Sequence, residues 1–112
     1  MNMSFSFNKV KRSFFTVELK TPDGENGKKL IVKMPKKKTF EKINAIGDTD
    51  NMSMDDAFDT MGGIVSEILS NNMSGERVST EYVTENYDIE EMYAFIDNFM
   101  DFVNGKAKTD PN

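Results

Sequence analysis

Alternating apolar residues in two segments near the start of the chain predict a β-hairpin. The segments "SFFTVELK" (13–20) and "KKLIVKM" (28–34) place apolar side chains at every second position, the period of a strand that buries one face. Between them, "TPDGENG" (21–27) is rich in turn residues and contains Asp-Gly. Residues 5–10 are a candidate edge strand through their two phenylalanines. The predicted inner face of the hairpin consists of Phe15, Val17, Leu19, Leu30, Val32 and Met34.

The rest of the chain has the three- and four-residue apolar spacing of amphipathic helices. We predict a short helix that is capped by Thr39 and runs to Ile46, and a helix of about five turns after Ser53. One or two further turns follow within 79–86, and the last helix covers 88–105. The predicted fold class is therefore α+β: an N-terminal β-hairpin or small antiparallel sheet followed by three to four packed helices.

The length of the chain indicates one domain. A chain of 112 residues is long enough to bury a core of its own, so we assign residues 1–105 to a single α+β domain. Residues 106–112, "KAKTDPN", are polar, and we expect this tail to be disordered.

Local signals mark the ends of the predicted helices. Ser53 is a typical N-cap, Asp88 and Glu91 have the spacing of a capping box, and Gly105 can adopt the left-handed conformation that stops a helix. Gly62–Gly63 interrupts the apolar pattern of the second helix. These glycines indicate either a kink or the close approach of another helix, or else a hinge.

Charge divides the chain into two halves. Residues 1–42 carry eleven Lys/Arg and four Asp/Glu, a net charge of +7, whereas residues 43–112 carry three Lys/Arg and fifteen Asp/Glu, a net charge of −12. The basic half of one copy can therefore attract the acidic half of another. This distribution allows head-to-tail self-association.

Composition and motifs argue against catalysis. The chain contains no cysteine and no histidine, which excludes Cys/His zinc sites and His-activated nucleophiles. Acids in "DTDNMSMDDAFD" (48–59) partly match a calcium-binding loop, but Ser53 stands where the loop needs glycine. Adjacent carboxylates on a helix point about 100° apart and do not converge. We expect no catalytic, cofactor or metal site, and no enzyme activity.

The last predicted helix is apolar over a wider arc than one core contact requires. Its apolar positions span about 180°, whereas a surface helix needs little more than 100°. The helix is either covered on two sides, by the hairpin and by the second helix, or it presents one apolar edge to another protein. Under the second hypothesis, which the nine methionines slightly favour, the partner-binding residues are Met92, Phe95, Phe99 and Phe102.

A cluster of lysines follows the hairpin. The basic patch consists of Lys33 at the end of the return strand and of Lys36, Lys37 and Lys38 in the stretch "MPKKKTF" (34–40) that follows. Such a patch can bind nucleic acid, but lysines also protect an edge strand from pairing with other chains. The acidic half would be repelled by phosphates, so nucleic acid is not the partner we expect. A small nucleic-acid-binding regulator that uses the basic hairpin is nevertheless the second hypothesis for function.

Membrane association is not expected either. No apolar run approaches the roughly 20 residues that a bilayer span requires. The opening "MNMSFSFNKVKR" also lacks the continuous apolar segment of a signal peptide.

In its size and in the order of these features, the chain resembles a tail assembly chaperone of long-tailed phages or prophages of Gram-positive bacteria. The resemblance covers most of the chain: a Phe-rich basic opening, "LIVKMPKKKTFEKI", the acidic–aromatic helix "YDIEEMYAFIDNFMDFVNG", and a short polar tail. It implies a non-enzymatic protein of the host cytoplasm that is absent from the mature virion. Its implied partners are the phage tape measure protein, which the chaperone coats, and the tail tube protein, which it recruits.

Overall fold

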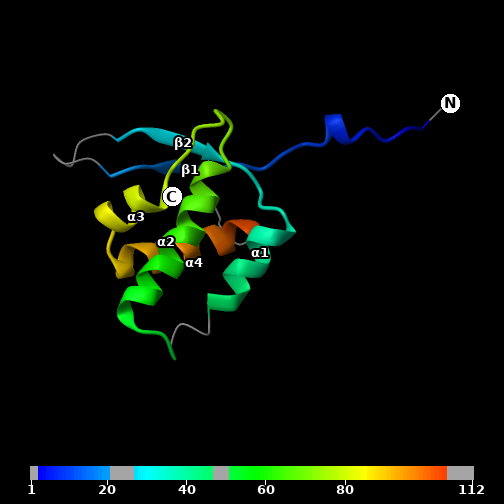
Figure 1. The fold of residues 1–112 in the computed structure, drawn as a ribbon. Helices are drawn as coiled ribbons and strands as arrows, with labels where there is room; N and C mark the ends of the chain where they lie inside the picture. Colours follow the sequence, from blue (N-terminus) through cyan, green and yellow to red (C-terminus); the bar gives the residue numbers. More distant parts are fainter. Residues whose placement is uncertain (1–2, 21–26, 47–50, 106–112) are drawn as a thin grey trace.

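The computed structural model describes residues 3–20, 27–46 and 51–105, and these form an α+β fold. A two-stranded antiparallel sheet is followed along the chain by four α-helices (Figure 1). A short 3₁₀ turn, η1, precedes the sheet. The elements are η1 (Phe7–Lys9), β1 (Phe15–Glu18), β2 (Lys29–Val32), α1 (Lys37–Asn44), α2 (Met54–Ser70), α3 (Thr80–Asn86) and α4 (Ile89–Val103). The expected tail at 106–112 lies outside the described residues.

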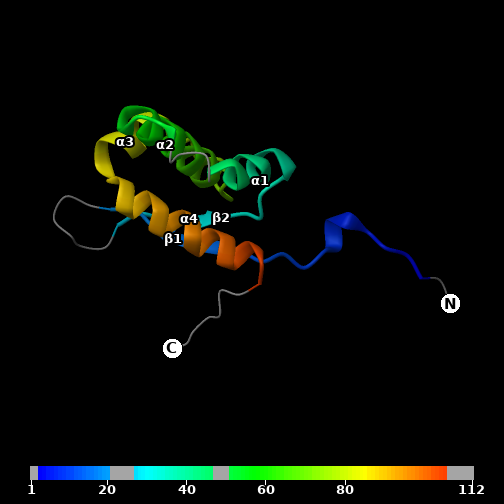
Figure 2. The same ribbon diagram turned by 90° about the horizontal axis from the view of Figure 1, so that it is seen from below.

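Helix α2 is the centre of the fold. It packs against α1, α3, α4 and β2. Figure 2 shows α1, α2 and α3 in one layer, with the hairpin and α4 beside each other below them. The core lies between these layers because α1, α3, α4 and β2 each pack an apolar face against α2. Its fully buried side chains include Val32, Met61, Ile68, Val83, Met92 and Phe99.

The predicted hairpin is confirmed, but its strands are shorter than expected. Phe15 pairs with Val32, and the register continues to the end of β1. Met34 was predicted on the inner face, yet it lies beyond β2 and its side chain is exposed. The predicted edge strand at 5–10 is wrong, because this segment contains η1 instead.

The outer edge of β2 is occupied by a segment that follows α2. The backbone N–H of Lys33 donates to the carbonyl of Asn71 at 2.9 Å, and that of Met73 donates to the carbonyl of Ile31 at 2.8 Å. Asn72 is buried, and its side-chain amide donates to the carbonyls of Leu69 and Glu76, both at 2.8 Å. The end of α2 is therefore held to the hairpin by paired backbone groups.

Most predicted helix ends are confirmed. The Ser53 hydroxyl accepts from the backbone of Asp56 at 3.2 Å, and the reciprocal bonds of the Asp88–Glu91 capping box are both present. Gly105 has a φ of 74°, the left-handed conformation expected after α4.

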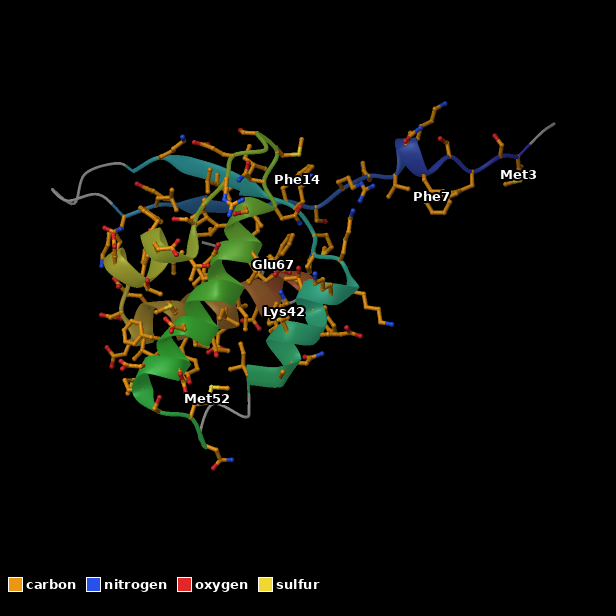
Figure 3. The ribbon with its side chains drawn as sticks, in the orientation of Figure 1. Met3, Phe7, Phe14, Lys42, Met52 and Glu67 are labelled. Atoms are coloured by element: carbon orange, nitrogen blue, oxygen red, sulfur yellow. The ribbon has the colours of Figure 1, made fainter. Side chains whose placement is uncertain are left out.

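Thr39 does not cap α1, which begins at Lys37 after Lys36, and this prediction is wrong. The Thr39 hydroxyl instead donates to the carboxylate of Glu67 on α2. Lys42 Nζ lies 2.7 Å from the same carboxylate, and Figure 3 shows Lys42 and Glu67 facing each other across the two helices. Glu67 therefore holds α1 against α2.

These bonds predict an acid-dependent loss of stability. The hydrogen bonds from Lys42 and, next, from Thr39 lower the pKa of Glu67 below its ordinary value of 4.5. A lowered folded-state pKa means that the ionised form stabilises the fold above the unfolded pKa, and that this contribution is lost as pH falls. We expect Glu67→Gln to lower the urea midpoint at neutral pH, with the gap to wild type narrowing between about pH 6 and about pH 3. A gap that stays constant would contradict this assignment.

Gly62 marks the closest approach of α2 and α3. A Cβ placed on Gly62 would lie 2.5 Å from Cγ2 of Thr84, whereas a Cβ on Gly63 would meet nothing within 4 Å. Helix α2 runs without interruption through both glycines. Of the two hypotheses for Gly62–Gly63, helix packing is therefore confirmed at Gly62.

Candidate functional site

The aromatic edge of α4 is mostly part of the core. Met92 and Phe99 are buried, and Phe95 and Phe102 are half-buried. The ring of Phe15 on β1 covers this edge: its centroid lies 6.1 Å from that of Phe95, 5.8 Å from Phe99 and 5.3 Å from Phe102. Helix α4 packs on α2, and Phe15 of the hairpin covers the aromatic edge from the other side. This favours the first of the two hypotheses, in which most of the wide apolar arc serves the fold.

The basic patch is exposed but is not one cluster. Lys33 follows β2, Lys36 precedes α1, and Lys37 and Lys38 lie in the first turn of α1. Lys33 and Lys36 line a hollow together with Arg12, whereas Lys37 forms a loose pair with Glu41 at 3.8 Å. The structure therefore brings two of the four predicted lysines together and adds an arginine.

Apolar side chains gather at the same place. Phe14, Ile31, Met34 and Met73 have exposed fractions between 38% and 56%. The hollow of about 420 Å³ is lined by three of them, and Ile31 accepts the backbone hydrogen bond from Met73. We call this region the hairpin surface; it consists of Arg12, Phe14, Ile31, Lys33, Met34, Lys36 and Met73. Figure 3 labels Phe14 where the hairpin meets the segment that precedes it.

Sequence periodicity could identify only part of this surface. Ile31 is out of phase with the buried Leu30 and Val32, which was a signal for an outward-facing apolar residue. Met73 carried no such signal, because its position depends on the long-range pairing of residues 71–73 with β2.

A second feature is an apolar pocket between β1, α2 and α4, which we call the α4 pocket. Its volume is about 310 Å³. Leu19, Met92 and Phe95 are among its walls, and Glu18, Lys20 and Glu91 supply its polar rim. It includes two of the predicted partner-binding residues. The complete lining is Val17, Glu18, Leu19, Lys20, Val65, Leu69, Tyr87, Glu91, Met92 and Phe95.

The rim of the α4 pocket is organised by Lys20. Its ammonium group lies 2.7 Å from the carboxylate of Glu91, donates to the carbonyl of Asn86 at 3.1 Å, and lies 5.4 Å from the ring centroid of Tyr87. The hydrogen bond from the Lys20 ammonium to the Glu91 carboxylate lowers the pKa of Glu91 and raises the pKa of Lys20. Nearby, burial and a bond to Tyr87 raise the pKa of Tyr82 to about 12. These groups stay in one charge state near neutral pH, so they position one another rather than exchange protons.

Two kinds of site are absent from the described part of the chain. Within residues 3–20, 27–46 and 51–105, no group of three or more Asp, Glu, His or Cys side chains is placed to hold a metal ion. None of the helices in these ranges has the length and apolar character needed to cross a membrane.

Comparison with known proteins found no match. No protein-family model fits the chain, and neither a curated protein nor a solved structure is similar to it. Function is therefore inferred from the surfaces described above and from the resemblance in sequence features.

Proposed function

We propose that this protein is a non-enzymatic tail assembly chaperone of a long-tailed phage. It binds the tape measure protein in the host cytoplasm, recruits tail tube subunits, and is left out of the mature virion. The resemblance in the order of sequence features supports the identity of these partners. The hairpin surface supports a protein-binding role and is the site that we assign to the tape measure protein.

The observation that carries this proposal is the composition of the hairpin surface. Three partly exposed apolar side chains, Phe14, Met34 and Met73, line the hollow together with three cations, and Ile31 is bonded through its backbone to Met73. Methionine side chains adapt to irregular apolar partners, and the cations favour acidic ones. The surface therefore fits an amphipathic segment with apolar and acidic residues, which is how a client helix would dock.

The strength of one such contact explains why many copies would be needed. Fully burying an apolar side chain contributes roughly 1.5–3 kcal/mol, so covering four that are about half exposed contributes roughly 3–6 kcal/mol. Association itself costs roughly 4–15 kcal/mol. A single copy would bind its client weakly, whereas a row of linked copies along a long client gains affinity through effective concentration.

A nucleic-acid-binding regulator is the alternative that uses the same lysines. Proteins that bind single strands stack bases on aromatic rings, but Phe14 is the one aromatic residue of the hairpin surface. The other apolar members are aliphatic, which favours a protein client. Salt separates the two hypotheses, because phosphate binding loses roughly 10³–10⁵ in affinity between 50 and 200 mM salt.

Co-expression with the tape measure protein encoded in the same genome tests the proposal. We expect the tagged chain to retain this client, and Ile31→Ser/Met73→Ser to retain less than about a tenth of it, because both apolar contacts are lost. Met54→Ser is the matched control, since Met54 is also exposed but lies at the far end of α2. Retention should fall less than about tenfold when salt rises from 50 to 200 mM.

Two results would contradict the proposal. One is equal retention by wild type and by the double variant. The other is a chain that releases the client but binds DNA or RNA with steep salt dependence and loses this binding in Lys36→Ser/Lys37→Ser/Lys38→Ser, as the regulator hypothesis requires.

A further inference from the structure

The segment before the hairpin is an apolar arm outside the core. Residues Met3–Lys11, which we call the arm, extend away from the helices in Figures 1 and 2. The exposed fractions are 91% for Met3, 72% for Phe5 and 78% for Phe7. The rings of Phe5 and Phe7 pack edge to face with centroids 4.9 Å apart. Figure 3 labels Met3 and Phe7 far from the helices. Two large aromatic side chains exposed on one short segment indicate a contact with another molecule.

The arm is basic as well as apolar. Lys9 and Lys11 are exposed, and the arm contains no Asp or Glu. Neither lysine takes part in an ion pair with another described residue. The arm therefore fits a receptor that combines an apolar pocket with acidic groups.

The α4 pocket has these properties. Its walls are apolar, and its volume of about 310 Å³ has room for an aromatic side chain. Glu18 and Glu91 lie on its rim, whereas Glu90, Asp97 and Asp101 are exposed on the part of α4 that does not line the pocket. Among the described residues, the ion pairs leave these last three acids without a cation. The negative charge of α4 therefore attracts the basic arm toward this side of the molecule, which favours the arm as the occupant of the pocket.

The backbone of β1 offers a further contact at the same place. The described sheet consists of β1 and β2, and only the outer edge of β2 is covered, by residues 71–73. The pocket is lined by the consecutive residues 17–20, so it lies along the other edge of β1. An extended segment can add to such an edge through backbone hydrogen bonds while a side chain fills the neighbouring pocket.

We infer that the arm of one copy docks into the α4 pocket of a second copy. Phe7 or Phe5 fills the pocket, and the positive charge of Lys9 and Lys11 is attracted by Glu18 on the rim and by the acidic surface of α4. The arm leaves from the start of β1, whereas the pocket lies at the end of β1. Each contact therefore joins two different surfaces, and copies that repeat it in one direction form an open chain. This assembly is separate from client binding, which uses the hairpin surface.

Engineered cysteines test this contact in the full-length protein. Because the natural chain has no cysteine, any disulfide must come from the introduced residues. We expect Phe7→Cys/Glu18→Cys to form a ladder of disulfide-linked multimers under mild oxidation. The matched control is Phe7→Cys/Asn44→Cys, since Asn44 is exposed at the end of α1 and does not line the pocket. We expect at most dimers from the control.

Light scattering without cysteines gives a second measurement. The average molar mass of the wild type should rise with protein concentration and fall at high salt, while Phe5→Ser/Phe7→Ser stays monomeric. These substitutions change exposed side chains, so circular dichroism should show an unchanged fold. Equal ladders from both cysteine pairs, or a monomeric wild type with no ladder, would overturn the inference. Neither result bears on client retention through the hairpin surface, so the two proposals can fail independently.

Discussion

Replacing Phe99 by alanine will lower the free energy of unfolding by about 3–5 kcal/mol. Phe99 is completely buried on α4, and its ring packs against Phe15, Phe95 and Phe102 at centroid distances of 5.8, 6.3 and 5.9 Å. Truncation removes the buried ring and leaves a cavity at the place where α4 and the hairpin meet. Because domains of this kind are stable by only about 5–15 kcal/mol, the variant should be close to unfolding at 37 °C. Urea denaturation followed by circular dichroism measures the difference.

Phe14→Ala is the matched control for this substitution. It removes the same side chain from a neighbouring position, but Phe14 is partly exposed and lies on the hairpin surface. We expect a loss of less than about 1 kcal/mol, in the range of surface substitutions. Equal losses for the two variants would show that the rings around Phe15 do not form the core contact described here.

Replacing Gly62 by valine will lower the free energy of unfolding by about 1–3 kcal/mol, because the new side chain must enter the space of Thr84 on α3. The same change at Gly63 provides the comparison, since a Cβ there meets nothing within 4 Å. Gly63→Val should change stability by less than about 0.5 kcal/mol, close to the small difference between the two helix propensities. Thermal or urea unfolding of the two variants measures this difference in the free energy of unfolding.

A compensating substitution on α3 tests whether contact with Thr84 causes the stability loss expected in Gly62→Val. Thr84→Ser removes the methyl group that lies 2.5 Å from the added Cβ, so it should recover part of the loss in the Gly62→Val variant. No recovery, together with a similar loss at Gly63, would indicate a general effect of valine in α2 and would contradict the packing role of Gly62.

Local signals in the sequence were enough to place the helix ends. Ser53, the Asp88–Glu91 pair and Gly105 act on backbone groups within three or four residues, so their roles follow from spacing alone. Thr39 has the same chemistry as Ser53, yet its hydroxyl bonds to Glu67, which lies 28 residues away in the chain. The local sequence around Thr39 cannot predict an acceptor that is so distant in the chain.

The function of the α4 edge could not be decided from the width of its apolar arc. A helix covered on two sides and a helix that offers one side to a partner have the same periodicity. The decisive fact is the position of Phe15, whose ring covers Phe95, Phe99 and Phe102 from the hairpin side. A polar substitution of Phe95 or Phe102 would consequently disturb the fold and is a poor test of client binding.

The hairpin surface was missed for a related reason. Its lysines and Phe14 are evident in the sequence, but Met34 was expected inside the core and Met73 lies 40 residues further along the chain than Lys33. The pairing of residues 71–73 with β2 brings Met73 next to the hairpin residues of this surface. Residues 5–10 of the arm were likewise expected to form an edge strand, but they contain η1 and extend away from the sheet.

The most direct test of client binding at the hairpin surface is hydrogen–deuterium exchange of the chain alone and in complex with the co-expressed tape measure protein. Binding at this surface should slow the exchange of amides at 29–34 and 71–75, where the backbone of β2 and of the segment after α2 lies under the bound client. Exchange in α1 and at the start of α2 should stay unchanged. Protection confined to α4, or no protection at 29–34 and 71–75 in a complex that does form, would contradict the proposed site.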